Sequence, residues 1–439
     1  ETLCSANSLI TYVLRTLFQR RWIRFADGIC AAATPPGAAE WRRRGDAVLG
    51  FLQADGRLYI RTADGRPPDF ATADLVVEED VLPIGNCAFL RDVSQQERPA
   101  LLFNSAFFLL EQDDTFHYHS ALGEAHSLWA AAGVIERPPL FRRGALWQGR
   151  DKRWSFGLPA LTDLAISLPN GLRLIYAGQA AGAWLPFSFN DEATAPVHVY
   201  TRYFGVESAG RVLGVTPHAS GRLELTVVDR RVVGWKRGGG LPIPHNGFVI
   251  SFAANALTAA EEDELLAVLA TLPRIDYTFV TESLQGVEQA LQTGPLLLRD
   301  GRSILHDRYL ADVEQFWPSR FLADGSRQIG VVPTNYALDV DRTRAGRIGI
   351  GVDEAGDLLV VMAAGVNDGF GIPGVDSVGA TLAELAEALR VQGAVHAVNL
   401  DGGGSTQAYF NGQRALIPGD RREQPGKIFA RMVPAVGMA

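Results

Sequence analysis

The chain has 439 residues, of which 47% are hydrophobic and 21% charged, the usage of an ordinary globular protein. Its formal net charge of −8 argues against nucleic acid as a partner, because backbone phosphates require a basic protein face. No stretch reaches the ~18 apolar residues that a membrane span requires. We therefore expect neither a nucleic-acid partner nor a membrane span.

The N-terminal quarter carries few interpretable signals. Residues 9–18 place their large apolar side chains on one side of an expected amphipathic helix. Cys4, Cys30 and Cys87 are an odd number at wide spacing, which indicates neither a disulfide framework nor a zinc site. The chain begins at Glu1 and shows no signal peptide, so a cytoplasmic location and export followed by trimming both stay open.

Strand signals outnumber helix signals in the next part of the chain. Two hairpins are predicted where turn residues separate apolar runs, at 48–53 with 57–62 and at 164–168 with 172–177. Further strands are expected at 197–203, 222–228 and 232–235. The capping box from Thr258 to Glu261 predicts a helix that ends near Leu272.

These elements predict an α+β fold with mixed, strand-rich sheets and helices packed on one side. No regular alternation of strand and helix appears, which argues against a parallel doubly wound sheet. The polar run near Glu97 suggests a soft boundary. It would separate an N-terminal strand-rich section, 1–96, from the main domain, 97–439, although both sections could belong to one globule.

The most informative stretch lies near the C-terminus. A capping box at Thr381 predicts a helix that ends before Gly393, and an apolar run at 394–400 then predicts a buried strand. The strand stops at Asp401, which three glycines and two hydroxyl residues follow. Consecutive glycines indicate that backbone N–H groups approach a ligand closely, often an anion. Neither a Walker loop nor a dinucleotide fingerprint fits, because no Lys follows the glycines and a strand, not a helix, is expected next.

The segment GATLAELAEALRVQGAVHAVNLDGGGST resembles the core motif of the phosphodiester glycosidases. Weaker matches occur in the same order upstream: Asn104 to Phe108, Ile243 to Ser251, Gly294 to Gly301 and Arg347 to Gly351. Two positions depart from the family pattern. Ser105-Ala106 stands where glycines are usual, and Ile348-Gly349 stands where Thr-Ala is usual.

The resemblance implies a hydrolase that cleaves a sugar-1-phosphodiester, with a small molecule or glycan as its substrate. Asp401 would be the catalytic carboxylate, Arg347 would bind the phosphate, and Asn104 would hydrogen-bond the sugar or phosphate. The other expected substrate-binding residues are Asn399, Gly402, Gly403, Gly404, Ser405, Thr406, Phe107, Arg327 and His306.

Two alternatives stand beside this reading of function. The departures from the family pattern allow altered chemistry on a specialised glycan or metabolite, and a glycan-binding module without catalysis is the third class. We expect no metal and no cofactor, and keep a divalent metal as an alternative. His117 and His119 would share one face of a strand, and Asp339 and Asp341 could hold a cation or supply a second carboxylate.

Overall fold

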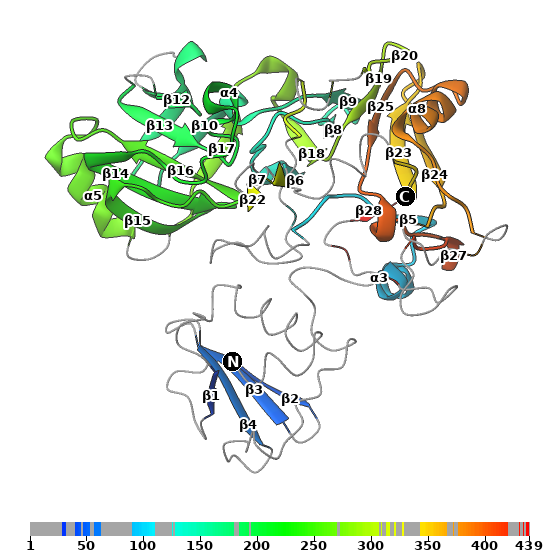
Figure 1. The fold of residues 1–439 in the computed structure, drawn as a ribbon, viewed down its shortest axis with the longest axis horizontal. Coiled ribbons are helices and arrows are strands. Elements are labelled where there is room, and N and C mark those ends of the chain that lie inside the picture. Colours follow the sequence, from blue (N-terminus) through cyan, green and yellow to red (C-terminus); the bar gives the residue numbers. More distant parts are fainter. Residues whose placement is uncertain are drawn as a thin grey trace. The chain divides into compact units, whose positions relative to one another are not determined.

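In the computed structural model the chain divides into two compact units (Figure 1). Unit 1 comprises Glu1–Ala88 with Leu109–Glu124, and unit 2 comprises Phe89–Phe108 with Ala125–Ala439. The structure describes residues 29–31, 40–44, 47–52, 57–62, 90–109, 125, 128–179, 184–192, 195–269, 273–306, 309, 313–316, 320–321, 327–328, 343–366, 372, 376–419, 430, 433 and 436–438. The domain boundary predicted at residue 97 falls at the end of helix α3 (Leu90–Glu97) and stays a proposal.

Unit 1 contains a four-stranded sheet in the order β1-β4-β3-β2. Its strands are β1 (Ile29–Ala31), β2 (Glu40–Arg44), β3 (Ala47–Leu52) and β4 (Arg57–Thr62). Strands β3 and β4 pair antiparallel, which confirms the first predicted hairpin. Cys30 lies in β1, whereas Cys4, Cys87 and the helix expected at 9–18 fall outside the described residues.

The largest sheet of unit 2 has eight strands in the order β15-β14-β16-β13-β12-β11-β10-β17. They are β10 (Leu164–Ser167), β11 (Arg173–Tyr176), β12 (Leu185–Phe189), β13 (Val197–Tyr200), β14 (His218–Val228), β15 (Arg231–Gly239), β16 (Gly247–Phe252) and β17 (Asp276–Phe279). The sheet is mixed, because β12 pairs in parallel with both β11 and β13 while the other pairs are antiparallel. The hairpin of β10 with β11 confirms the second predicted one.

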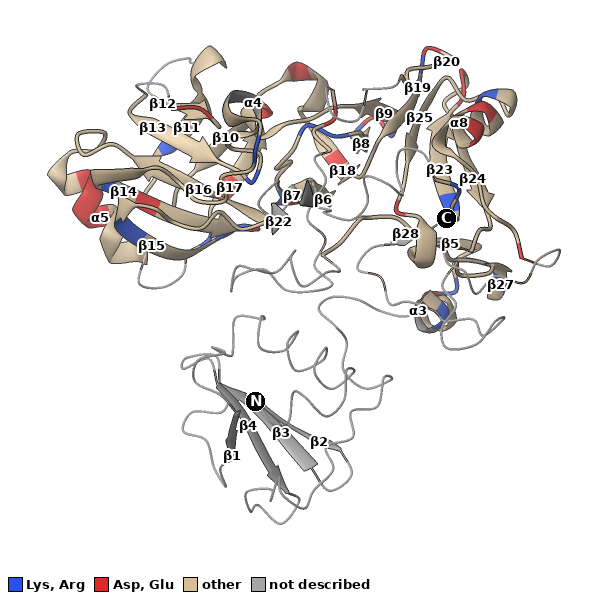
Figure 2. Cartoon of the chain, in the orientation of Figure 1, with Lys and Arg blue, Asp and Glu red and all other residues tan. Residues whose placement is uncertain are grey.

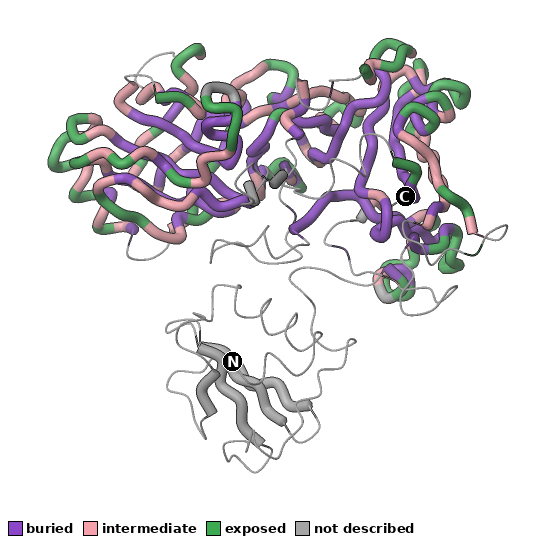
Figure 3. The backbone as a smooth tube through the Cα atoms, in the orientation of Figure 1, coloured by how far each residue is buried: buried purple, intermediate pink, exposed green. Residues whose placement is uncertain are grey.

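A five-stranded antiparallel sheet, β20-β19-β25-β23-β24, carries the motif from the sequence analysis. Its strands are β19 (Leu296–Arg299), β20 (Arg302–Ser303), β23 (Arg347–Val352), β24 (Leu358–Ala363) and β25 (His396–Asn399). Helix α8 (Leu382–Val391) packs on one face through Leu385 and Leu389. Ile348, Ile350 and Val398 pack on the other face. Figure 3 shows that the residues of the inner strands β25 and β23 are mostly buried.

Three further sheets, of five, four and two strands, lie among the described residues of unit 2. Their orders are β7-β6-β18-β8-β9, β27-β26-β5-β28 and β21-β22. The strands are β5 (Leu101–Asn104), β6 (Trp129–Ala131), β7 (Val134–Arg137), β8 (Ala145–Gly149), β9 (Trp154–Gly157), β18 (Val287–Gln292), β21 (Arg320–Phe321), β22 (Arg327–Gln328), β26 (Ala408–Phe410), β27 (Gln413–Leu416) and β28 (Val436–Met438). Strand β5 pairs with both β26 and β28, which brings residues near 104 beside the C-terminal motif.

The predicted α+β class is confirmed, because many strands accompany a few helices: α3, α4 (Val206–Ala209), α5 (Ala259–Leu269) and α8. Both predicted capping boxes form, at Thr258 with Glu261 and at Thr381 with Glu384. No helix among the described residues is long and apolar enough to cross a membrane. Basic and acidic positions are interspersed along the described ribbon, as Figure 2 shows.

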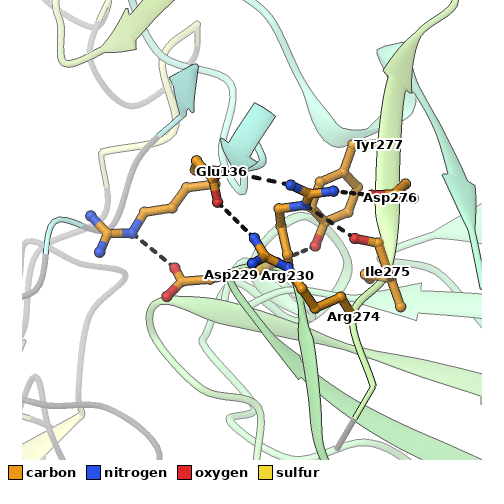
Figure 4. Close-up of polar contacts among 8 residues, drawn as sticks. Glu136, Asp229, Arg230, Arg274, Ile275, Asp276 and Tyr277 are labelled. Carbon is orange, nitrogen blue, oxygen red and sulfur yellow. Dashed lines mark hydrogen bonds and ion pairs between the residues drawn. The ribbon is translucent and has the colours of Figure 1, made fainter. Parts of the chain in front are cut away.

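An ionic cluster joins strand β7 to the edge of the eight-stranded sheet (Figure 4). Arg137 of β7 binds Asp229 with an Nε to Oδ1 distance of 2.8 Å. Arg230 pairs with Asp276 at the start of β17, and its Nη1 lies 3.6 Å from Glu136 of β7. Both side chains of the Arg137–Asp229 pair are largely covered, at 17% and 27% exposure, so this pair is screened less than a surface pair. The partners of Arg230 are 45% and 69% exposed, so its pairs contribute less to holding the two sheets together.

Gly349 lies where helix α8 approaches strand β23 most closely. A Cβ at this position would stand 2.7 Å from Leu389 Cδ1 and 3.2 Å from Leu385 Cγ. We expect Gly349→Ala to destabilise unit 2 by about 1–3 kcal/mol, because both leucines must move in a packed core. Urea unfolding of Gly349→Ala, of Leu389→Val and of the double variant tests this. The double variant should lose less unfolding free energy than the two single variants together. Strictly additive losses would contradict a contact between residue 349 and Leu389.

Candidate functional site

Arg347 and Asp401 face each other across neighbouring strands. Gly349 pairs with Asn399 in the antiparallel register of β23 and β25, and extension of that register by two residues places Arg347 opposite Asp401. Leu400 N–H donates to Ile348 O at 2.9 Å, which continues the pairing past the end of β25. Directly opposite residues point to the same face of a sheet, here the face that α8 covers. The structure therefore brings the two main predicted residues together.

The backbone of Asp401 is held at both ends. Its N–H donates to Ser105 O at 2.9 Å, and its carbonyl accepts from Asn104 Nδ2 at 2.7 Å. Asn104 also accepts from Gln407 N–H at 2.8 Å through Oδ1. Asn104 and Asp401 are both fully buried, with 0% exposure. The Asn104 amide thus ties the segment before the glycines to the segment after them and fixes where Asp401 lies.

The guanidinium of Arg347 is anchored to backbone carbonyls. Nε donates to Ala380 O at 3.1 Å, and Nη2 donates to Thr343 O at 2.9 Å. Ala380 immediately precedes Thr381, the N-cap of α8. These contacts set the orientation of a side chain that is only 2% exposed. Nε and Nη2 form the side edge of the guanidinium, and both bind backbone carbonyls. Arg347 therefore places a fixed positive charge at this point, and side-on binding of an oxyanion through that edge is not available.

The glycine run packs directly against the start of β23. Gly403 N–H donates to Gly346 O at 2.8 Å, and a Cβ on Gly402 would lie 2.6 Å from that same oxygen. Gly403 has φ +59°, a left-handed conformation in which glycine is favoured. The N–H groups of Ser405 and Thr406 donate within the turn, to Gly402 O and Gly403 O. From the sequence, N–H groups of this glycine run are expected to approach a ligand. Among the described residues, the N–H groups of Gly402 and Gly404 have no hydrogen-bond acceptor.

Three buried polar atoms around Asp401 have no hydrogen-bond partner in the described part of the chain. They are Ser105 Oγ, Asn399 Oδ1 and Thr406 Oγ1, on residues that are at most 2% exposed. Each buried polar group without a partner costs about 1–3 kcal/mol, so such groups are rare away from functional sites. Such atoms also occur away from this region, on Arg143 and Asn170 for example. The three near Asp401 differ in lying on segments that flank one carboxylate, where they are available to a polar ligand.

Three predicted residues remain: Phe107, His306 and Arg327. Phe107 is buried in the core beneath α8, with Leu297 and Leu385. His306 is exposed, and its ring stands edge-on to Tyr309 at 5.4 Å. Arg327 lies in β22, whose side chains are outside the described residues.

The alternative metal ligands cannot be placed, because His117, His119, Asp339 and Asp341 fall outside the described residues. Within the part of the chain that is described, no group of three or more His, Cys, Asp or Glu residues could hold a metal ion.

Comparison of the sequence with protein families gives one match. Residues 221–435 match the profile of the family described as phosphodiester glycosidase. The chain belongs to the phosphodiester glycosidase family. The match includes Arg347 and the Asp401 motif, whereas Asn104 and Phe107 lie before it. This is a family of hydrolases, and the resemblance inferred from the C-terminal motif is confirmed. No curated protein matches the chain.

Solved structures similar to this member of the family share little sequence with it. A hypothetical protein from Synechocystis is 21% identical with a TM-score of 0.41, over 80% of this chain and 53% of that one. A protein named as exported, from Burkholderia pseudomallei K96243, is 18% identical with a TM-score of 0.42, over 79% and 68%. The zebrafish N-acetylglucosamine-1-phosphodiester alpha-N-acetylglucosaminidase catalytic domain, auto-inhibited by pro-peptide, is 16% identical with a TM-score of 0.25, over 76% and 94%. The chain thus spans about half the length of the Synechocystis protein.

The departures from the phosphodiester glycosidase pattern have local structural reasons. Ile348 is fully buried on the sheet face away from α8, and Gly349 makes room for Leu389. Ala106 is buried in a small cluster with Ala125, and Ser105 supplies the carbonyl that holds Asp401. Ser105 bonds to Asp401 itself, and Gly349 pairs with Asn399 on the neighbouring strand.

Two buried charged residues, Glu314 and Arg143, were missed by sequence reasoning. Glu314 is fully buried and accepts from Gly144 N–H and Leu296 N–H, both at 2.6 Å. Burial raises the pKa of the Glu314 carboxyl to about 7 against these hydrogen bonds, and burial lowers the pKa of Arg143 to about 9. Arg143 lies between the rings of Phe141 and Phe316. The only signal in the sequence was a charged residue beside aromatic ones, which is too common to single out.

Proposed function

We propose that the chain hydrolyses a sugar-1-phosphodiester, with Asp401 as the catalytic carboxylate and Arg347 on the phosphate. The observation that carries this proposal is the placement of Arg347 directly opposite Asp401 in the extended register of β23 and β25. Membership in a family of phosphodiester glycosidases supports it. The partnerless polar atoms of Asn399 and Thr406 add groups that could contact sugar or phosphate oxygens.

The chemistry requires little beyond these groups. A phosphodiester attached to sugar carbon 1 leaves as a stabilised anion, so protonation of the leaving group is of minor importance. The site needs a cation for the phosphate and a carboxylate that acts as base, nucleophile or partner for developing positive charge. Arg347 and Asp401 supply these two groups from neighbouring strands. The amides of Gly402 and Gly404 and the hydroxyls of Ser405 and Thr406 would complete the oxygen contacts.

We assign Asn104 to positioning in this proposal, not to substrate contact. Its amide group binds the backbone on both sides of the glycine run, through Asp401 O and Gln407 N–H. Loss of this amide would let Asp401 move. Because displacement of a reacting group by about 1 Å can lower a rate by roughly a hundredfold, a positioning role is compatible with a large effect on turnover.

Hydrolysis of a panel of sugar-1-phosphodiesters by the wild type and by Arg347→Lys tests the proposal. We expect wild-type turnover, and a loss of about ten- to a thousandfold in Arg347→Lys, because a lysine ammonium cannot reproduce both backbone contacts that fix the position of the positive charge. Arg344→Lys is the matched control, since Arg344 lies three residues away and is exposed. Equal rates for Arg347→Lys and the wild type would remove Arg347 from the mechanism.

Two additions sharpen this experiment. Reaction in ¹⁸O-labelled water shows whether the new oxygen enters the sugar or the phosphate, and therefore which bond breaks. A chelator should leave the rate unchanged, and inhibition would indicate a metal. Absence of turnover on every member of the panel would favour altered chemistry or a binding module.

A further inference from the structure

A hollow of about 360 Å³ opens on the eight-stranded sheet, in a region that the proposed catalysis does not use. It lies over β13 and β14 and the loop before β13. Its lining residues are Glu192, Ala195, His198, Tyr200, Pro217, Ala219, Arg222 and Ala253. Sites for small ligands have volumes of about 300–1,000 Å³ and carry a few fixed polar groups, so the size is suitable for one small molecule.

A row of buried polar side chains crosses the sheet beside this hollow. Glu224 of β14 pairs with Ser251 of β16, Ser251 pairs with His198 of β13, and His198 pairs with Ser188 of β12. Residues directly opposite in a sheet share a face, so these four side chains lie in line. All four are at most 5% exposed. The alternate residues of the same strands, such as Val199, are apolar and face the other side.

The row is hydrogen-bonded internally. Ser251 Oγ donates to Glu224 Oε1 at 2.8 Å, Thr216 Oγ1 donates to Glu224 Oε2 at 2.7 Å, and Ser188 Oγ lies 2.9 Å from His198 Nδ1. Burying a carboxylate that two hydroxyls contact costs desolvation free energy, which an apolar side chain at the same position would not cost. Such a network is the kind of support that holds a binding residue in one orientation.

Arg222 is the residue that this network orients. Its Nε donates to Ser251 Oγ at 2.7 Å and its Nη2 donates to Ser251 O at 2.8 Å. The side edge of a guanidinium, formed by Nε and one Nη, is the edge that grips carboxylate or phosphate side-on. In Arg222 that edge is already occupied by Ser251. The side chain still lines the hollow, so it can offer single N–H donors there.

The charges around the hollow do not favour an anion. Arg222 stands among the carboxylates of Glu192 at the lining and Glu224 beneath it. Burial lowers the pKa of His198, so its imidazole is neutral at neutral pH. Burial raises the pKa of Tyr200, so its hydroxyl stays protonated. The lining therefore combines donors and acceptors without a net positive charge.

We propose that this hollow binds one uncharged sugar unit, whose hydroxyls accept from Arg222 and donate to Glu192. Each sugar hydroxyl both donates and accepts, so adjacent hydroxyls match a guanidinium and a carboxylate at the same time. His198 and Tyr200 would form the wall of this site. The inference stands on the eight-stranded sheet alone and holds whether or not Asp401 is catalytic.

Saturation-transfer NMR with N-acetylglucosamine and methyl α-glucoside, on wild type and on Glu192→Gln and Arg222→Gln, tests the proposal. We expect millimolar binding that weakens at least tenfold in each variant and persists in Asp401→Asn. The matched controls Glu264→Gln and Arg211→Gln, at exposed positions, should bind as the wild type does. Hydrogen exchange with and without sugar should show protection in peptides from β13. Glu192 is exposed, so its variant remains informative if Arg222→Gln fails to fold.

Three outcomes would overturn the sugar site. Failure of both sugars to bind the wild type would do so directly. Binding that is lost in Asp401→Asn but kept in Glu192→Gln would place the sugar at the Asp401 site only. Displacement of the sugar by inorganic phosphate or by glycine, at concentrations below that of the sugar, would instead identify the hollow as a site for an anion or a zwitterion.

Discussion

Replacement of Asp401 by asparagine is expected to lower the turnover of sugar-1-phosphodiesters by at least about 10²–10⁴-fold while the fold is kept. The exchange is nearly isosteric, and two contacts that hold residue 401 in place involve its backbone, with Ser105 O and Asn104 Nδ2. The variant therefore removes the charge of the carboxylate and leaves its position. Michaelis–Menten measurements on a substrate that the wild type hydrolyses give the ratio of kcat values.

The matched control is Asp357→Asn, an exposed carboxylate on the hairpin between β23 and β24. It should retain wild-type turnover. Thermal unfolding of both variants separates loss of chemistry from loss of structure. If Asp401→Asn hydrolyses the substrate at the wild-type rate, Asp401 is not the catalytic carboxylate. Asn104→Ala provides a second comparison. If Asn104 positions Asp401, its loss should lower turnover and also raise the rate of hydrogen exchange at 401–407.

Much of the architecture near the site was predictable from local sequence. The capping box at Thr381, the stop at Gly393 and the buried strand before Asp401 all depend on residues close together in the chain. The turn at Asn411-Gly412 likewise follows from two residues that adopt positive φ. Local patterns such as these specify an element, because the interactions that form it lie within that element.

The contacts between elements were not predictable in the same way. Nothing in the sequence near Asn104 indicates that its amide binds Asp401 O, 297 residues away. Asn104 was expected to contact substrate, whereas the structure shows its amide bound to the backbone. His306 was a candidate because it lies in a long stretch without clear pattern, and the structure places it in an exposed position beside Tyr309. Residue type alone cannot separate a ligand-binding amide from one that joins two segments.

The buried carboxylate of Glu314 gives the second large prediction, a loss of stability with rising pH. Its two oxygens accept from Gly144 and Leu296 N–H, and the charged or titratable groups that face it are Arg143 and Tyr309. Hydrogen bonds and Arg143 favour the ionised form, but burial outweighs them and raises the pKa to about 7. Arg143, with a pKa of about 9, stays charged below pH 8. Glu314 is therefore the member of this pair that titrates between pH 5 and 8.

The sign of the effect follows from the direction of the shift. A carboxyl that binds its proton more tightly in the folded state stabilises that state at low pH. This contribution is complete below the pKa of the unfolded chain, 4.5, and is lost as the pH rises through about 7. The difference between these two pKa values corresponds to roughly 3 kcal/mol of stability. Because other groups also titrate in this range, the informative quantity is the difference between wild type and Glu314→Gln at each pH.

Urea unfolding of wild type and Glu314→Gln between pH 5 and 8, followed by hydrogen exchange in peptides from β8 and β19, measures that difference. At pH 5 the variant should be less stable by about 1–3 kcal/mol, because glutamine has one accepting oxygen and its NH₂ group cannot accept from the second backbone N–H. Toward pH 8 the wild type should lose this advantage, since its carboxylate is then ionised and buried. Glu264→Gln, on the exposed side of α5, should show no such trend. A wild-type advantage that instead grows with pH would mean that attraction between Glu314 and Arg143 exceeds the cost of burying the charge.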